Sequence, residues 1–312
     1  MTPSPGQTQS PCPVCTSSGR PLYRHLSDRV HHVPGVWNTA ACTNAACDAQ
    51  WITPKPAAEA ILGFYAEYET HESTDSGGHP RLPSWYPSPL SRRQRAERTR
   101  TVLPPAVAVA PPGQLFEIGC GNGVNLLRLR SLGWAVGGQD FDPAAVDTAR
   151  LAGLDVSESL DAVLATHVGS FDVVLLSHVV EHVHDLDRVF ADASSLLTVG
   201  GTLVVITPNG QSLSAKAFRS AWRGLEAPRH LQVFGPRSLR AALTAQGFKH
   251  VKVSTNYLSD GFLAGRSVAP RNNRASLVVR GLATVGVQLV ADTALRWWPR
   301  RGGELIATAI RP

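Results

Sequence analysis

Apolar residues form short continuous runs along residues 114–310, and segments with helical periodicity separate most of them. The runs at 171–177 and 202–207 have almost no polar interruption, as expected of strands that are buried on both faces. This alternation predicts an α/β fold with a doubly wound, mostly parallel sheet. The predicted strands are 114–118, 134–140, 154–156, 171–177, 202–207, 248–255 and 304–310, and the predicted helices are 122–132, 143–151, 186–197 and 236–246.

The segments that flank this alternating core have a different composition. Residues 1–11 are polar and rich in Pro, so we expect them to be disordered, and residues 12–54 have few apolar runs. Residues 55–90 combine a helical pattern with a Gly-, Pro- and Ser-rich linker. The main domain is then expected over 91–312, with a basic helix at 91–102 and an insertion at 256–303.

The insertion contains an apolar segment, 276–298, that is interrupted by Arg280, Asp292 and Arg296. We expect an amphipathic helix that packs on the domain or on a second subunit. A peripheral membrane contact through 276–301 stays an alternative, because two Trp and two Arg residues lie together near its end. The sequence does not fix the oligomeric state.

Composition narrows the class of protein. The chain has 312 residues, 43% of them hydrophobic, which suffices for one large core and a small accessory unit. Without a signal peptide or an apolar stretch of about 18 residues, we expect an intracellular, cytoplasmic protein. The net charge is +6, yet residues 1–90 carry five basic and seven acidic residues, which disfavours a nucleic-acid partner for that part.

A Gly-rich turn follows the first predicted strand, in the sequence LFEIGCGNG at 115–123. Gly119, Gly121 and Gly123 would let the backbone take positive φ and approach a ligand closely. The dinucleotide fingerprint would need a glycine where Val124 stands. The carboxylate of Glu117 favours a cationic or amino-bearing ligand over a pyrophosphate, which it would repel.

A second acidic residue, Asp140, ends the next predicted strand in the sequence GQDFDP. A carboxylate at that position can bind both ribose hydroxyls of a nucleoside, and Phe141 could pack on the adenine face. Since the turn and both acids fall at the ends of neighbouring strands, the sequence predicts a nucleoside-binding site.

This arrangement resembles the class I S-adenosylmethionine-dependent methyltransferases. The matching segments are FEIGCGNG at 116–123, GGQDFDP at 137–143, FDVVLLSHVVEHVHD at 171–185, GGTLVVITPN at 200–209 and GELIATAI at 303–310. The resemblance implies a seven-stranded sheet whose last strand is antiparallel, with S-adenosyl-L-methionine as the methyl donor. Residues expected to bind this cofactor are Glu117, Gly119, Cys120, Gly121, Gly123, Asp140, Phe141 and Ser177.

The acceptor is expected beyond the strand that ends at Ser177, where His178, Glu181 and His182 would share one face of a helical turn. A histidine there could be a general base, the three residues could bind a metal, or Glu181 and His182 could only fix the loop. The segment resembles quinone-pathway O-methyltransferases with a Glu-x-x-Glu-His metal motif, except that His178 replaces the first Glu.

Another histidine, His230, stands in the sequence PRHL at 228–231. It resembles an element of sugar- and small-molecule-modifying relatives that lies near the acceptor. We therefore place His230 with His182 and His178 among the candidate catalytic residues, against the alternative of a packed loop histidine.

Four of the five cysteines form two pairs near the N-terminus, Cys12 with Cys15 and Cys42 with Cys47. In a chain without an export signal, such pairs predict a metal site before disulfides. Four thiolates could bind one Zn²⁺ in a tetrahedral, structural site. Together with a Phe-Tyr helix, this leader resembles a bacterial methyltransferase subgroup with an N-terminal zinc ribbon.

The leading hypothesis is therefore a methyltransferase that acts on a small molecule such as a sugar, nucleotide sugar, polyketide or lipid-linked glycan, at oxygen or carbon. Alternatives are a zinc-ribbon RNA methyltransferase, a quinone-pathway-like O-methyltransferase and a non-enzymatic binding protein that keeps the nucleoside pocket.

Overall fold

The computed structural model describes residues 10–29, 31–64, 112–256, 260–268, 274–294 and 301–312 of the chain. The predicted linker, the basic helix at 91–102 and the Trp-rich end of the insertion lie outside the described residues.

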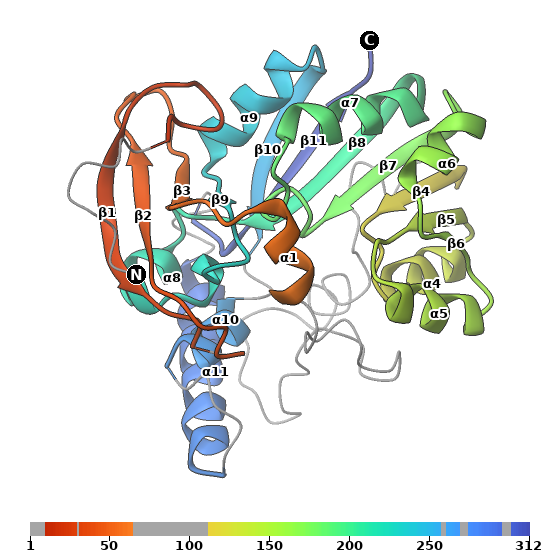
Figure 1. The fold of residues 1–312 in the computed structure, drawn as a ribbon. Helices are drawn as coiled ribbons and strands as arrows, with labels where there is room; N and C mark the ends of the chain where they lie inside the picture. The colour runs from red at the N-terminus through yellow and green to blue at the C-terminus, as the bar shows by residue number, and fades with distance from the viewer. Residues whose placement is uncertain (1–9, 30, 65–111, 257–259, 269–273, 295–300) are drawn as a thin grey trace.

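A seven-stranded sheet forms the centre of the main domain (Figure 1). Its strand order is β10-β11-β8-β7-β4-β5-β6, and only β11 runs antiparallel to its neighbours. The predicted doubly wound, mostly parallel α/β fold is thus confirmed. The strands are β4 (Gln114–Ile118), β5 (Ala135–Gln139), β6 (Asp155–Ser157), β7 (Phe171–Ser177), β8 (Leu197–Pro208), β10 (Lys249–Asn256) and β11 (Glu304–Ile310).

Helices cover both faces of this sheet, which explains the continuous apolar runs of its strands. Val174 and Leu176 of β7 pack toward α7 and α9, whereas Val173 and Leu175 pack toward α4 and α5. Because successive side chains of a strand point to opposite faces, both faces of β7 need apolar residues. These helices are α4 (Val124–Ser131), α5 (Pro143–Leu151), α6 (Leu160–Thr166), α7 (Leu186–Leu196) and α9 (Pro236–Ala245).

The N-terminal residues form a small antiparallel sheet of β1 (Gly19–Leu26), β2 (Trp37–Cys42) and β3 (Gln50–Thr53). A short strand from the main domain, β9 (Gln232–Val233), extends this sheet by pairing with β3. We call residues 10–53 the N-terminal module; helix α1 (Ala58–Phe64) follows it. Because β9 begins two residues after His230, the module is joined by main-chain hydrogen bonds to a candidate site segment.

A buried carboxylate, Asp48, makes a second junction between the module and the main domain. Asp48 accepts hydrogen bonds from the backbone N–H of Ser238 at 2.8 Å and of Arg237 at 3.2 Å, and both donors belong to the first turn of α9. A Cβ at Gly235 would lie 2.3 Å from Cγ of Asp48, so this close approach needs a glycine.

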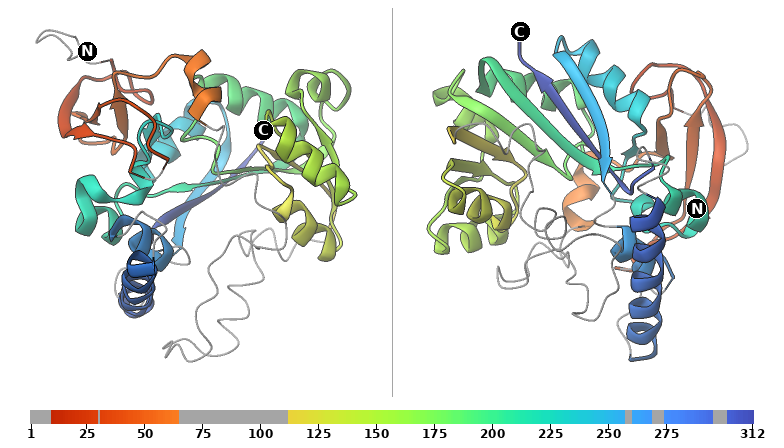
Figure 2. Two further views of the ribbon diagram at one scale, coloured as in Figure 1. Left: turned by 60° about the horizontal axis from the view of Figure 1, so that its bottom comes forward. Right: turned by 180° about the vertical axis from the view of Figure 1, so that it is seen from behind.

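The structure describes three further helices: α8 (Leu213–Phe218), α10 (Asp260–Val268) and α11 (Arg274–Ala294). Helices α8 and α10 contact the module, and α11 packs against α10. The predicted amphipathic helix of the insertion corresponds to α11, which projects beyond α10 (Figure 2). On α11, Val279, Leu282 and Val290 are exposed. None of the helices that the structure describes has the length and apolar character needed to span a membrane.

Candidate functional site

The Gly-rich turn leaves β4 at the edge of the sheet where the parallel strands end. The backbone φ values of Gly119, Gly121 and Gly123 are 71°, 53° and 79°, and residues other than glycine rarely adopt such values. A Cβ at Gly119 would lie 2.5 Å from Cγ2 of Val179, in the loop after β7. The turn therefore packs directly against the segment that contains the candidate acceptor residues.

Glu117 lies on β4 just before this turn and is buried. Its Oε1 accepts a hydrogen bond of 2.9 Å from Nδ2 of Asn125, while its Oε2 has no hydrogen-bond partner among the described residues. Burial raises the pKa of Glu117 to about 8; the bond from Asn125 opposes this rise and the Asp140 carboxylate adds to it. Glu117 is thus largely protonated at pH 7, and its Oε2 suits a cationic ligand that displaces this proton.

Asp140 follows β5 and faces the same turn. Its Oδ2 accepts a 2.7 Å hydrogen bond from the N–H of Gly121, and its Oδ1 accepts a 3.0 Å bond from Asp142. Burial raises the pKa of Asp140, whereas these backbone bonds lower it. Phe141 beside it is 50% exposed. Cys120 is instead buried, where a Cβ at Gly138 would contact its sulfur.

The loop after β7 does not form the helical turn that the sequence suggested. His178 has a φ of 57°, and a turn over residues 180–182 follows. Nδ1 of His178 lies 3.1 Å from Oε1 of Glu181, and its Nε2 lies 3.3 Å from Oε1 of Glu304. Desolvation lowers the pKa of His178, but the two carboxylates outweigh it and raise the pKa well above its usual value.

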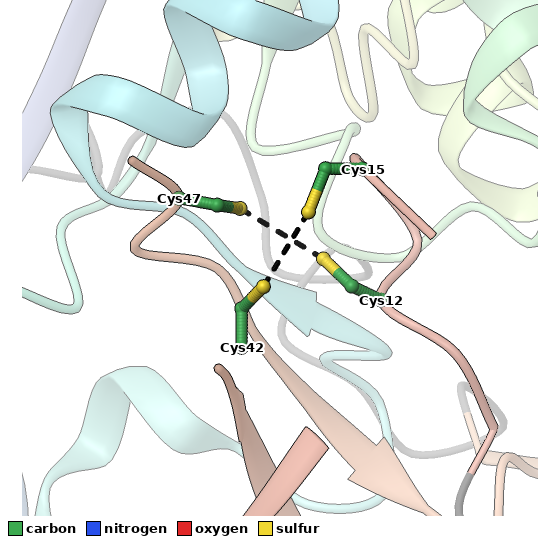
Figure 3. A group of neighbouring side chains, drawn as sticks. All are labelled: Cys12, Cys15, Cys42 and Cys47. Carbon is green, nitrogen blue, oxygen red and sulfur yellow. Dashed lines mark hydrogen bonds between the residues drawn. The ribbon is translucent and has the colours of Figure 1, made fainter. Parts of the chain in front are cut away.

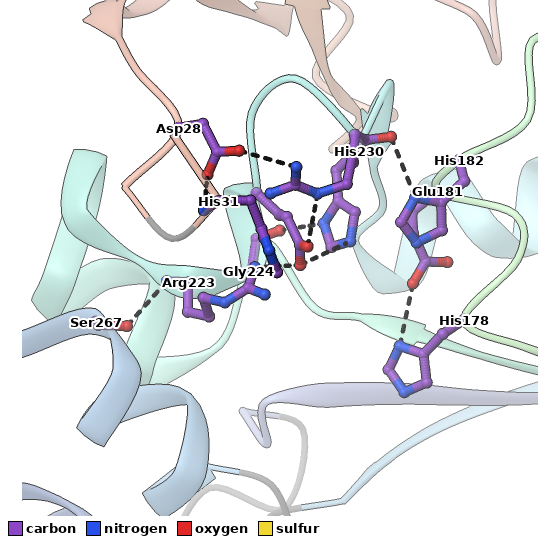
Figure 4. A network of polar contacts seen from close by, with 11 residues as sticks. Asp28, His31, His178, Glu181, His182, Arg223, Gly224, His230 and Ser267 are labelled. Atoms are coloured by element: carbon purple, nitrogen blue, oxygen red, sulfur yellow. Dashed lines mark hydrogen bonds and ion pairs between the residues drawn. The ribbon is translucent and has the colours of Figure 1, made fainter. Parts of the chain in front are cut away.

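His182 is separated from His178 and pairs instead with His230, as Figure 4 shows. The two rings meet edge to face with centroids 4.6 Å apart. Nδ1 of His182 lies 3.1 Å from the carbonyl oxygen of Arg229, and Nδ1 of His230 lies 2.8 Å from that of Gly224. A carbonyl oxygen can only accept, so each Nδ1 carries the hydrogen and each Nε2 carries the lone pair of a neutral ring.

Burial keeps both of these imidazoles neutral. Desolvation and the neighbouring His230 lower the pKa of His182 to about 4. Desolvation also lowers the pKa of His230, against the opposing influence of Glu226 and Glu181. Both rings are therefore held in the neutral form at neutral pH.

Glu181 lies between His178 and the histidine pair and is fully buried. Its Oε2 accepts a 2.9 Å hydrogen bond from Oγ1 of Thr207. Burial raises the pKa of Glu181, but the hydrogen bond and charge of His178 dominate and bring it to about 2. One potential metal-ligand atom each of Glu181, His182 and His230 lies within 4.8 Å of the other two, a spacing that could hold a metal ion. His178 contacts Glu181 but is not a member of this group, in which His230 takes the place expected for His178.

The four cysteines of the N-terminal module converge on one point (Figure 3). The sulfurs of Cys12 and Cys47 are 3.8 Å apart, and those of Cys15 and Cys42 are 3.4 Å apart. Both distances exceed the ~2.05 Å of a disulfide bond. They are close to the separation of about 3.8 Å that a tetrahedron with Zn–S bonds of ~2.3 Å requires.

Several residues at this site were not identified from the sequence. Thr207 and Glu304 come from β8 and β11, and Glu226 lies four residues before His230. Gln232 donates from Nε2 to the carbonyl oxygens of Val180 and Val183, which ties the His230 segment to the loop after β7. Only the Glu226–His230 spacing was visible in the sequence, and nothing marked it as significant.

Comparison with known proteins supports the class suggested by this geometry. A family model described as a methyltransferase domain matches residues 91–253. A ubiquinone biosynthesis O-methyltransferase of Brucella anthropi is 29% identical over 168 residues, covering 49% of this chain and 68% of the relative. One of the same name from Xanthomonas campestris pv. campestris is 36% identical over 112 residues, covering 33% and 47%.

The matched parts thus span between about half and two thirds of these relatives. Among solved structures, that of the [4+2]-cyclase SpnF has a TM-score of 0.51 at 20% identity, covering 83% of this chain and 98% of that one. At this identity the similarity concerns the fold alone, and a fold by itself does not determine the reaction.

The histidines of the loop after β7 differ in charge, and NMR spectroscopy can measure this. In long-range ¹H–¹⁵N spectra at pH 6, we expect His182 to be neutral with its hydrogen on Nδ1, and His178 to be protonated. His182 should gain its second proton only near pH 4, because protonation would place a charge in a desolvated site. Assignments would come from His178→Gln and His182→Gln variants. Protonation of His182 near its ordinary pKa of about 6.5 would contradict this assignment of states.

Proposed function

We infer the reaction from the premise that this chain belongs to the methyltransferase domain family and contains a class I S-adenosylmethionine-dependent methyltransferase domain. We propose that it methylates a hydroxyl group of a small molecule. The observation that carries this proposal is the neutral His182–His230 pair. His182 belongs to the loop after β7, whose Val179 packs against Gly119 of the Gly-rich turn.

The methyl-donor side is proposed to lie between Glu117 and Asp140. S-Adenosylmethionine supplies an electrophilic methyl group on a sulfonium. The unpartnered, buried Oε2 of Glu117 fits the donors of its methionyl part, close to the Gly119 backbone. Asp140 would accept from the ribose hydroxyls, and the accessible ring of Phe141 would cover the adenine. Cys120, Gly121, Gly123 and Ser177 complete the proposed cofactor-binding set.

On the acceptor side, His230 and His182 would act as general bases. A hydroxyl oxygen becomes a stronger nucleophile as it loses its proton, and a neutral imidazole can accept that proton in the transition state. The acceptor oxygen would form a bond to the methyl carbon as the carbon–sulfur bond breaks, and Nε2 of the histidine would take the proton. His178 would contribute by holding Glu181, which lies within reach of the pair.

The acceptor is proposed to be a small molecule with a phenolic or sugar-type hydroxyl. Two relatives named ubiquinone biosynthesis O-methyltransferase support oxygen as the acceptor atom. Sugars, nucleotide sugars, polyketides and lipid-linked glycans remain within the proposed class. The acidic excess of residues 1–90 speaks against an RNA substrate.

A metal-assisted variant of the same reaction is a second candidate, because Glu181, His182 and His230 have the spacing of metal ligands. A divalent ion bound there would polarise the acceptor hydroxyl and lower its pKa. Turnover that is lost with EDTA and restored by Mg²⁺ or Zn²⁺, at unchanged metal content of the cysteine cluster, would favour this variant. Full turnover in EDTA would exclude it.

We also propose that Cys12, Cys15, Cys42 and Cys47 bind one structural Zn²⁺. The convergence of their sulfurs supports this, and four thiolates would leave no open coordination position.

Ligand binding should change the protonation of Glu117. Because burial holds its pKa near 8, a bound cation should expel about one proton at pH 7, and affinity should rise between pH 6 and pH 8 as the free protein loses that proton. Calorimetry in two buffers with different ionisation enthalpies measures the released proton. The Glu117→Gln variant should bind more weakly and without proton release. Equal heats in both buffers for the unmodified protein would refute the assignment of Glu117.

His230 should matter for turnover and not for donor binding. We expect His230→Ala to lower turnover by roughly 10²- to 10⁴-fold, the usual contribution of a general base. Formation of S-adenosylhomocysteine would be measured with 3,4-dihydroxybenzoate, a nucleotide sugar and an RNA oligonucleotide. His167→Ala, at an exposed histidine, is the matched control. Undiminished turnover in His230→Ala would remove this residue from the mechanism, and methylation of the RNA alone would overturn the small-molecule assignment.

The cysteine cluster predicts about one zinc ion per chain by elemental analysis. Cys12→Ser and Cys47→Ser should each lose the metal and lower the midpoint of thermal unfolding, because zinc binding stabilises the folded module. Cys120→Ser is the control, since this cysteine lies outside the cluster. Retention of stoichiometric zinc by the Cys12 and Cys47 variants would contradict the site.

A further inference from the structure

A buried row of charged side chains connects the N-terminal module to the histidine pair (Figure 4). It begins at Asp28, in the connection between β1 and β2, and continues through Arg229 and Glu226 to His230. The Asp28 side chain is 2% exposed and that of Arg229 is fully buried. A charge buried this deeply is stable only when it is paired, so each ion pair of the row must keep its geometry for the charges to remain compensated.

The module fixes the first member of this row. Asp28 accepts hydrogen bonds from the backbone N–H of His31 at 3.1 Å and of Val33 at 3.3 Å. Its Oδ2 also accepts from Nη1 of Arg229 at 2.8 Å. The carboxylate is therefore held in place by its own loop, and it presents a fixed negative charge to the main domain.

Arg229 connects Asp28 to two further residues, Glu226 and His182. Its Nε donates to Oε1 of Glu226 at 3.0 Å, and its carbonyl oxygen accepts from Nδ1 of His182 at 3.1 Å. Arg229 thus contacts Glu226 through its side chain. Through its main chain it contacts Nδ1 of His182, the nitrogen whose hydrogen bond determines the tautomer of that ring.

Glu226 connects the row to His230. Its Oε2 forms an ion pair with Arg223 and lies 3.6 Å from Nε2 of His230. Burial raises the pKa of Glu226, but the positive charges of Arg223 and Arg229 hold it well below its usual value, so the carboxylate stays charged. A fixed negative charge at this distance favours proton uptake at Nε2, while the hydrogen bond from Nδ1 to the carbonyl oxygen of Gly224 fixes the orientation of the ring.

We propose that Asp28 is a positioning residue of the acceptor site: through Arg229 and Glu226, the N-terminal module sets the orientation of His182 and His230. This inference rests on the proposed function of the two histidines. Loss of the Asp28 charge would leave the Arg229 guanidinium with one carboxylate fewer in a buried site. Arg229 would then shift, and His182 would lose the geometry of its Nδ1 hydrogen bond.

The test uses the full chain, with Asp28→Asn as the variant and Asp48→Asn as the matched control. Both residues are buried carboxylates of the module that contact the main domain, but Asp48 binds α9 and does not touch the histidine pair. In Asp28→Asn, we expect the imidazole ¹⁵N signals of His182 and His230 to shift. Turnover should be measured with the acceptor that the unmodified protein methylates, from among 3,4-dihydroxybenzoate, the nucleotide sugar and the RNA oligonucleotide. It should fall at least tenfold, with unchanged KM and unchanged affinity for S-adenosylmethionine. Asp48→Asn should leave the signals and turnover unchanged.

The possible results separate this inference from the proposed function. Unchanged histidine signals in a folded Asp28→Asn protein would overturn the positioning role. Shifted signals with full turnover would support the coupling and refute the histidines as bases. If Asp28→Asn does not fold, Asp28→Glu keeps the charge one methylene farther out. Shifted histidine signals in that variant would support the inference, and signals like those of the unmodified protein would overturn it.

Discussion

The parallel pairing of β4 with β5 and β7 is the constraint on which the candidate site depends. In this register Ile118 of β4 lies opposite Gln139 of β5 and Leu176 of β7, so all three strands end at one edge. The Gly-rich turn, Asp140 and the loop after β7 must therefore share a small space. Gly119 makes this concrete, since its backbone packs against Val179 so closely that a side chain would not fit. The proposed donor and acceptor sides meet at that contact.

Burial has opposite consequences for the acidic and basic groups at this edge, and both are useful. It raises the pKa of Glu117, which leaves a neutral acid where a cationic ligand is proposed to bind. It lowers the pKa of His182 and His230, which leaves neutral bases where a proton is proposed to be removed. Glu181 and Glu226 keep their charges in the same interior because histidine or arginine partners surround them. The site thus combines buried groups that desolvation keeps neutral with buried carboxylates that neighbouring cations keep charged.

The N-terminal module is joined to this site at several independent points. The pairing of β3 with β9 extends its sheet into the main domain, and Asp48, next to Cys47, caps the first turn of α9. Asp28 adds a buried ion pair with Arg229. Each junction satisfies polar groups that would be costly to bury alone, so the module and the acceptor loop are expected to order together.

The sequence by itself determined the features that depend on local patterns. The predicted boundaries of β4, α5, β7 and β11 agree with the structure, because periodicity and buried runs are properties of neighbouring residues. The Gly-rich turn and the cysteine pairs were recognisable for the same reason. The short elements α6, α8 and β9 were missed, since they hold too few residues to show a period. Only the tertiary structure decided that His182 meets His230 rather than His178, and that Asp28 meets Arg229 across 201 positions of the chain. Such contacts follow from how the sheets and loops pack, and no spacing along the chain encodes them.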